Sequence, residues 1–161
     1  MLHIVAALAG SVRLMRKDRP DLLATFRHLP LFADCTEEEL LEIDSLADEA
    51  HVPAGRDLFR QGDVGREFAV VTEGEVIIRR DDVEVARIGP GGWIGELALL
   101  ASVERTATVT AAVDTTVQVI DRRGFQTLLE DSPSLTLNLL RATAARLAAL
   151  EDEASVLRQP D

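Results

Sequence analysis

Hydrophobic and polar positions divide the chain into helical ends and a central region of short strands. From residue 21 to residue 50 the apolar positions follow a helical spacing that is broken at Pro30. Thr36 and Glu39 have the spacing of a capping box, which predicts that a helix begins just after Thr36. We expect the carboxylates of this stretch to form a solvated face rather than a metal site. They are Asp34, Glu37, Glu38, Glu39, Glu42, Asp44, Asp48 and Glu49.

The segment from His51 to Ile120 has the pattern of an all-β unit. Short runs rich in Val, Ile, Thr and Phe are separated by glycine and aspartate turns. Residues 106–113 alternate hydroxyl-bearing and apolar side chains over much of their length, as a strand with one buried face requires. Short strands at this regular spacing predict a roll or a barrel.

Helical periodicity returns after Asp121, and a second helix is predicted with Ser132 as N-cap and Pro133 in its first turn. Apolar residues then recur at heptad spacing. They are Leu140, Leu147 and Ala154, with Leu150 and Leu157 three residues beyond two of them. The pattern fits either the seam of a homodimer or a helix that simply packs on the roll.

Residues 1 to 20 are expected to form an N-terminal helical extension. An apolar run from Leu2 to Leu14 is followed by basic residues and a single acid, Asp18. The extension either packs on the domain or on a second copy, or lies on a membrane surface or a partner. The run is too short to cross a membrane and has no basic region before it, so we expect no transmembrane segment and no signal peptide.

Composition narrows the class of protein. The chain has 161 residues, enough for one domain, which we expect over residues 21–161 with the roll at about 51–120 and C-terminal helices at about 121–157. Its one cysteine, Cys35, forms no internal disulfide and fits a reducing, cytoplasmic setting. A net charge of −11 argues against non-specific nucleic-acid binding, so an anionic ligand has to be held by a local group of residues.

Such a group is present between Gly92 and Val109. Gly95 permits close approach of the backbone, and the apolar run after it can form one helical turn whose free N–H groups point at an anion. Arg105 supplies a charge-assisted contact to the same anion. A buried carboxylate at Glu96 requires a donor, which a sugar hydroxyl provides. These are the groups that a cyclic nucleotide presents.

The sequence resembles the cyclic nucleotide-binding domain family, which includes the catabolite activator protein and protein kinase A regulatory subunits. Residues 95–99 and 105–109 match its phosphate-binding cassette, and the resemblance covers roughly residues 27 to 150. It implies a mainly β fold of the double-stranded β-helix (jelly-roll) type with N-terminal helices and two C-terminal helices. We call residues 95–109 the cassette.

The resemblance also implies roles for individual residues. Glu96 accepts from the ribose 2′-hydroxyl and Arg105 binds the exocyclic phosphate oxygens. Backbone donors or close contacts come from Gly95, Leu97, Ala98 and Ala107. The resemblance implies that Thr106 touches phosphate or base and that Arg146, just before Leu147, caps the purine. In the alternative interpretation, Arg146 lies with Arg141 and Arg158 on the solvated outer face of the helix and does not contact the ligand.

Two positions depart from the family pattern. Ile94 stands where Phe is frequent, and Glu104 stands before Arg105 where Pro is frequent, so a competing carboxylate is expected near the phosphate contact. A hydroxyl at Thr106 accompanies cGMP preference in eukaryotic members, while bacterial members with Ser or Thr bind cAMP. We expect cAMP as the ligand, with cGMP as the alternative.

Other classes fit the sequence less well. A cupin-like metalloenzyme needs gathered ligands, whereas the three histidines, His3, His28 and His51, have no paired spacing, so no metal and no cofactor are expected. No nucleophile motif surrounds Cys35. Because only a short stretch follows Leu150, we expect no helix-turn-helix domain within this sequence, and if the sequence is a fragment of a longer chain we expect the effector in the missing part. We therefore expect a non-enzymatic regulatory module whose effector protein is unknown, and the remaining rival is a β-roll scaffold that binds no nucleotide.

Overall fold

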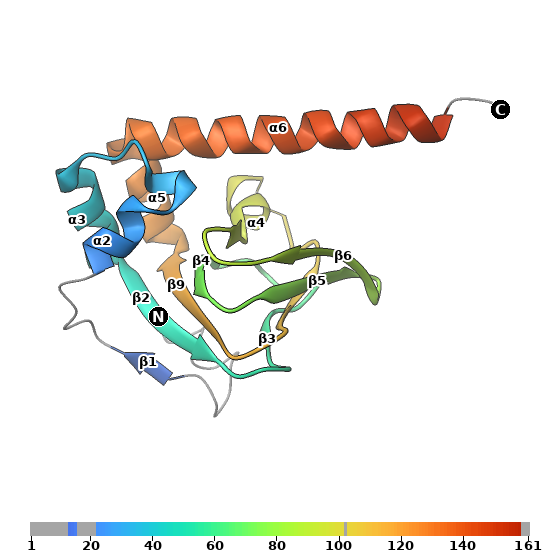
Figure 1. Cartoon of the computed structure of the whole chain (residues 1–161), viewed down its shortest axis with the longest axis horizontal. Helices are drawn as coiled ribbons and strands as arrows, with labels where there is room; N and C mark the ends of the chain where they lie inside the picture. The colour runs from blue at the N-terminus through green and yellow to red at the C-terminus, as the bar shows by residue number, and fades with distance from the viewer. Residues whose placement is uncertain (1–12, 16–21, 102, 159–161) are drawn as a thin grey trace.

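Two antiparallel sheets form the body of the fold (Figure 1). In the computed structural model, which describes residues 13–15, 22–101 and 103–158, one sheet has the strand order β1-β2-β9-β4-β7 and the other β3-β8-β5-β6. The strands are β1 (Arg13–Met15), β2 (Ala47–Val52), β3 (Asp57–Phe59), β4 (Glu67–Glu73), β5 (Val76–Arg80), β6 (Val83–Ile88), β7 (Trp93–Ile94), β8 (Thr108–Ala111) and β9 (Thr115–Asp121). The predicted mainly β fold with flanking helices is confirmed.

Strand β4 is buried on both faces because it lies between two cores. Phe68 and Val70 belong to the core under the helices, whereas Ala69 and Val71 belong to the core between the two sheets. This explains why β4 is a continuous apolar run rather than an alternating one. It pairs with β9 and with β7, the strand that leads into the cassette.

Most of the short helices gather at one end of the roll, the helix of the cassette lies apart from them, and one long helix crosses the roll (Figure 1). They are α2 (Leu22–Arg27), the short 3-10 helix η1 (Pro30–Phe32), α3 (Glu37–Leu46), α4 (Glu96–Leu100), α5 (Arg122–Asp131) and α6 (Pro133–Arg158). The capping box at the start of α3 is confirmed: the Glu39 N–H donates to Thr36 Oγ1 over 3.1 Å, and the Thr36 N–H donates to Glu39 Oε1 over 3.3 Å.

The helix predicted to run to Ala50 ends at Leu46, so the prediction was wrong for its last residues. Residues 47–52 instead form β2, whose whole length pairs with β9. Glu49, expected on a solvated face, is only 4% exposed and lies 3.3 Å from His51 Nε2. Long-range strand pairing overrides the local helical spacing here, because Ala47, Ala50 and Val52 become buried in the sheet.

The N-terminal extension also departs from prediction where it is described. Residues 13–15 were expected to be helical but form β1, which pairs antiparallel with β2 with Arg13 opposite His51 and Met15 opposite Glu49. The edge of β2 presents backbone groups that need partners, and an extended segment supplies them. The rest of residues 1 to 20 lies outside the described residues.

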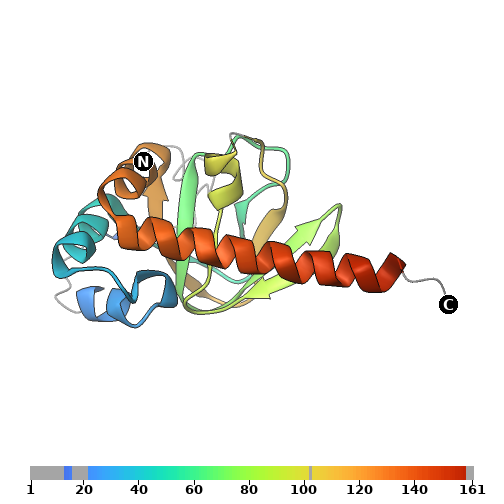
Figure 2. The same ribbon diagram turned by 90° about the horizontal axis from the view of Figure 1, so that it is seen from above.

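Helix α6 starts where it was predicted to start. The Thr136 N–H donates to the Ser132 carbonyl, as at a helix start, while the Ser132 hydroxyl donates to the Glu39 carboxylate. Leu135 and Leu139 are buried against the helical core. Beyond Leu139 the helix is largely exposed, and Figure 2 shows it crossing above the roll and projecting past the β5–β6 hairpin.

Candidate functional site

The cassette begins where β7 ends, at a glycine that the geometry requires. Gly95 has a φ of 95°, in the left-handed region, and is the N-cap of α4. A Cβ at this position would lie 2.7 Å from Arg105 Nη1 and 2.7 Å from the Glu67 carbonyl oxygen. The chain therefore turns from strand to helix here only because residue 95 has no side chain.

Helix α4 is the single turn that the sequence predicts. The N–H groups of Glu96, Leu97 and Ala98 lie in its first turn, where an α-helix offers no carbonyl partner, and they are the donors available to an anion. Ala98 is buried and Leu97 is exposed. A Cβ at Gly65 would overlap the Cβ of Ala98, so Gly65 lets α4 pack closely on the loop before β4.

The Arg105 side chain is buried within the cassette and contacts several neighbouring groups. It is 6% exposed, and its Nη2 donates to the Glu67 carbonyl oxygen over 2.7 Å and lies 3.5 Å from Glu67 Oε2. Its Nη1 donates to the Gly95 carbonyl over 3.3 Å, and its Cζ lies 3.6 Å from the centroid of the Phe59 ring. Burial lowers the pKa of Arg105, and the Glu67 carboxylate opposes that shift.

The backbone of Arg105 is fixed as firmly as its side chain. Its N–H donates to the Asp63 carbonyl over 2.8 Å, and its carbonyl accepts from the Gly62 N–H over 2.9 Å. Arg122 holds the same loop from the other side, because its Nη2 donates to the Gly65 carbonyl over 2.7 Å. The fold thus places two guanidinium groups near the cassette of a chain whose net charge is −11.

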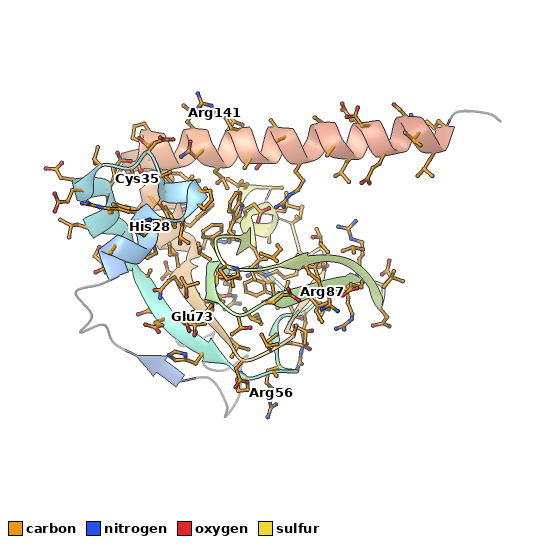
Figure 3. The ribbon with its side chains drawn as sticks, in the orientation of Figure 1. His28, Cys35, Arg56, Glu73, Arg87 and Arg141 are labelled. Carbon is orange, nitrogen blue, oxygen red and sulfur yellow. The ribbon has the colours of Figure 1, made fainter. Side chains whose placement is uncertain are left out.

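Glu96 is buried in the cassette and contacts the long helix. It is 4% exposed, and Arg146 Nη1 donates to its Oε1 over 3.1 Å. The Arg146 side chain is 53% exposed, so only its tip reaches the cassette. The sequence predicted that Arg146 caps the purine, and the structure gives it the carboxylate of Glu96 as its partner. Arg141, by contrast, lies on the face of α6 turned away from the roll (Figure 3).

The residues after Arg105 lead into β8. Thr106 is exposed, and its carbonyl accepts from Arg80 Nε over 3.3 Å. Ala107 is buried and continues the cassette into the sheet. The exposed Glu104 forms an isolated backbone bridge with Val64. The expected competition for Arg105 therefore has a different source, because the carboxylate that contacts the guanidinium is Glu67.

A cavity of about 120 Å³ adjoins Arg105. Its walls include Phe59 and Glu67, with Asp57 and Asp63 adding two further carboxylates. Pockets for small organic ligands usually exceed about 300 Å³. The cavity is therefore smaller than a nucleotide needs, and Arg60 adds a second guanidinium to its walls beside that of Arg105.

Sequence reasoning missed three residues on other strands that contact Arg105 or Thr106 of the cassette. Phe59 lies on β3, Glu67 on β4 and Arg80 on β5, and each approaches the cassette through sheet pairing rather than through sequence spacing. The only signal available was the Gly65-Arg-Glu-Phe68 stretch, in which a charged residue stands just before a buried strand.

The described residues hold neither a candidate metal-ion site nor a candidate membrane-spanning helix. They contain no group of three or more His, Cys, Asp and Glu side chains placed to hold a metal ion. Within the same part of the chain, no helix has both the length and the apolar character needed to cross a membrane.

Comparison with known proteins agrees with the geometry of the cassette. The chain is 32% identical over 137 residues to a cAMP-dependent protein kinase regulatory subunit of Blastocladiella emersonii, an alignment that covers 82% of this chain and 34% of that protein. It is 30% identical to an uncharacterized NTE family protein of Mycobacterium bovis, over 87% of this chain and 24% of that protein. The chain thus spans about a third or less of these relatives.

Solved structures give the same result. The catabolite activator protein of Thermus thermophilus superposes with a TM-score of 0.73 at 31% sequence identity, covering 80% of this chain and 62% of that one. The family model for the cyclic nucleotide-binding domain matches residues 49–132, which include the whole cassette. The chain belongs to the cyclic nucleotide-binding domain family.

Proposed function

We propose that this chain is a receptor that binds a cyclic nucleotide, with cAMP favoured over cGMP, through the cassette. The observation that carries the proposal is the convergence of three groups on one short segment. They are the first turn of α4 behind Gly95, the buried guanidinium of Arg105 and the buried carboxylate of Glu96. The first two suit a phosphate, and the third suits a donor such as a sugar hydroxyl.

The contacts follow from the chemistry of each group. The cyclic phosphate accepts hydrogen bonds from the N–H groups of α4 and from Arg105, whose contacts with Glu67 and Phe59 hold the guanidinium in place. The ribose 2′-hydroxyl donates to Glu96. Gly95 and Ala107 allow the backbone to approach the ligand, and Thr106 lies at the end of the cassette where phosphate or base is reached.

Binding is coupled to α6 through one exposed contact. A ribose hydroxyl that donates to Glu96 competes with Arg146 for the Glu96 carboxylate. When the hydrogen bond between Arg146 and Glu96 is broken, α6 no longer has this contact with the cassette. The ligand therefore shifts the population of α6 positions and changes the helical surface shown to a partner. Crystals of the free and the saturated protein test this step, because an identical α6 in both would contradict it.

The preference for cAMP rests on relatives rather than on a contact with the base. A protein named as a cAMP-dependent protein kinase regulatory subunit aligns with most of this chain, and it supports cAMP as the ligand. The residue at the base end of the cassette, Thr106, is compatible with either nucleotide.

We place the role of this segment in ligand binding and regulation rather than in catalysis. The family match covers a binding domain, and the relatives are several times longer than the aligned segment. An effector or enzyme domain belongs, in this proposal, to a partner protein or to another part of a longer chain. One relative is an NTE family protein, which is consistent with fusion to a separate domain.

A second candidate is a β-roll scaffold that binds no nucleotide. It is favoured by one observation: both key groups already have partners within the chain, Glu96 through Arg146 and Arg105 through Glu67. A ligand therefore has to replace at least the exposed contact between Arg146 and Glu96.

Equilibrium dialysis of the purified chain against cAMP, cGMP and 5′-AMP separates the candidates. The receptor proposal predicts micromolar or tighter binding of a cyclic nucleotide, with 5′-AMP much weaker because the open phosphate carries more charge and a different shape. Absence of binding to both cyclic nucleotides would favour the scaffold.

A further inference from the structure

The turn that joins β5 to β6 has a strained backbone. Arg80 pairs with Val83, so Asp81 and Asp82 form a two-residue tip, and their φ values are 51° and 63°. Both values lie in the left-handed region, which is costly for a residue with a side chain, and a turn of this kind usually has glycine at its second position. Such strain persists only where the surrounding structure fixes the conformation.

Asp81 is fixed by a reciprocal pair of hydrogen bonds with Gln61. The Gln61 Nε2 donates to Asp81 Oδ1 over 2.9 Å, and the Asp81 N–H donates to Gln61 Oε1 over 2.9 Å. We call Gln61 and Asp81 the clasp. Figure 1 shows the β5–β6 hairpin at the end of the roll opposite α2, α3 and α5. The clasp therefore joins the tip of this hairpin to the segment that follows β3.

The Gln61 side of the clasp leads directly to the backbone of Arg105. The Gln61 N–H donates to Thr108 Oγ1 over 3.0 Å, within the cassette. The next residue, Gly62, donates its N–H to the Arg105 carbonyl over 2.9 Å, and the Arg105 N–H donates to the Asp63 carbonyl over 2.8 Å. Residues 61–63 therefore hold both polar groups of the Arg105 backbone.

The Asp81 side of the clasp reaches the residue that follows Arg105. Arg80, next to Asp81, donates from Nε to the Thr106 carbonyl over 3.3 Å. The hairpin tip thus contacts both residues 61–63 and the chain just after Arg105. The Arg105 side chain is held by buried groups, whereas Gln61, Arg80 and Asp81, which support its backbone, are exposed.

We propose that Gln61 and Asp81 are positioning residues for Arg105. The clasp holds residues 61–63 against the hairpin tip, so the guanidinium is in place before a phosphate arrives. Neither residue touches the ligand, and both act through the backbone of residues 61–63. The consequence for nucleotide rests on the proposed function: with the clasp broken, this segment has to be ordered each time ligand binds, so bound ligand is released faster.

The support of Arg105 is tested without nucleotide by amide hydrogen exchange of the full chain, read by NMR at the Gly62 and Arg105 N–H groups. Gln61→Met removes both hydrogen bonds of the clasp and keeps the length of the side chain. It should speed exchange at both groups on the order of threefold to tenfold. Gln126→Met changes an exposed glutamine on α5 and should leave both rates as in wild type. Unchanged rates in Gln61→Met would overturn the proposal.

Reversal of the clasp separates its hydrogen bonds from its charge. Gln61→Glu alone places a second carboxylate opposite Asp81 and should speed exchange as Gln61→Met does. Adding Asp81→Asn lets the new amide donate to the new carboxylate and keeps the net charge at −11, so the double variant should exchange as slowly as wild type. Asp82→Asn, which shares the positive φ but lies outside the clasp, is the control. A double variant that exchanges as fast as Gln61→Glu would contradict the proposal.

The consequence for the ligand is tested by stopped-flow release of a fluorescent cAMP analogue from the full chain, with excess cAMP as the competitor. Gln61→Met should release the analogue on the order of threefold to tenfold faster than wild type, and the double variant should match wild type. Equal release rates in wild type and Gln61→Met would rule out a role of the clasp in ligand retention. A chain that binds no cyclic nucleotide would refute the receptor proposal, and the exchange rates would still decide whether the clasp positions Arg105.

Discussion

Arg105 and Arg146 approach the cassette from different parts of the molecule, and the structure holds them in different ways. Arg105 belongs to the roll, is 6% exposed, and contacts Gly95, Glu67 and Phe59. Arg146 belongs to α6, has a side chain that is 53% exposed, and contacts Glu96. One guanidinium is built into the core of the site, and the other rests on its surface.

The difference separates a permanent group from an exchangeable one. Moving Arg105 would break the contacts of a buried guanidinium with the Gly95 carbonyl, the Glu67 carbonyl and the Glu67 carboxylate, which is costly. Moving Arg146 exchanges one half-exposed ion pair for water or another carboxylate, which costs little. A ligand therefore uses Arg105 as a fixed anchor and changes the protein through Arg146.

The largest effect on stability is expected from Gly95→Ala, which disturbs the contacts around the buried Arg105. Strain at a positive φ and contacts with Arg105 and Glu67 should together lower the free energy of unfolding by about 2 to 4 kcal/mol, measured by chemical denaturation. Gly55→Ala is the control, because Gly55 also has a positive φ but has open space around it. It should cost about 1 to 2 kcal/mol. Equal losses would show that the cassette contacts contribute nothing.

A smaller effect is expected from Glu67→Gln, which removes the negative charge beside Arg105. The free energy of unfolding should fall by about 1 to 2 kcal/mol, because a buried guanidinium loses its ionic partner. Glu84→Gln removes one of the two exposed carboxylates, Glu75 and Glu84, that pair with Arg87, and it should leave stability nearly unchanged. If both substitutions changed the denaturation midpoint equally, the buried ion pair of Arg105 would contribute no more to stability than the exposed ion pair of Arg87, which would contradict the prediction.

The smallest effect on stability is expected from Arg146→Ala, which removes the exposed contact alone. The unfolding midpoint should stay close to that of wild type. Affinity for cAMP should rise about two- to fivefold, because the ribose hydroxyl no longer competes for Glu96. Arg141→Ala, on the face of α6 turned away from the roll, serves as the control. A lower affinity in Arg146→Ala would instead support the purine-capping role that the sequence predicted.

The sequence predicted those parts of the molecule that depend on local spacing. The capping box at Thr36, the helical turn after Gly95 and the start of α6 at Pro133 are each specified by neighbouring residues, and each was confirmed. Alternation of side chains likewise predicted the roll, because burial of one face of a strand leaves a period of two.

The parts that depend on distant strands were missed. Glu49 has helical neighbours in the sequence, but pairing with β9 on one side and β1 on the other makes it part of a strand. The contacts of Arg105 with Phe59 and Glu67 arise because β3 and β4, which belong to different sheets, meet at the cassette. The family resemblance points to Arg146 by its place just before Leu147, but its contact with Glu96 depends on how α6 crosses the roll.

The receptor account is tested most directly by titration calorimetry of wild type and Arg105→Ala with cAMP and with cGMP. The account predicts micromolar or tighter binding of cAMP to wild type, with cGMP weaker. It also predicts a loss of about tenfold or more in Arg105→Ala, since a charge-assisted contact contributes about 1.5 to 3 kcal/mol. Circular dichroism of the variant confirms that it is folded. Equal affinities in wild type and variant, or no heat of binding with either nucleotide, would contradict the account.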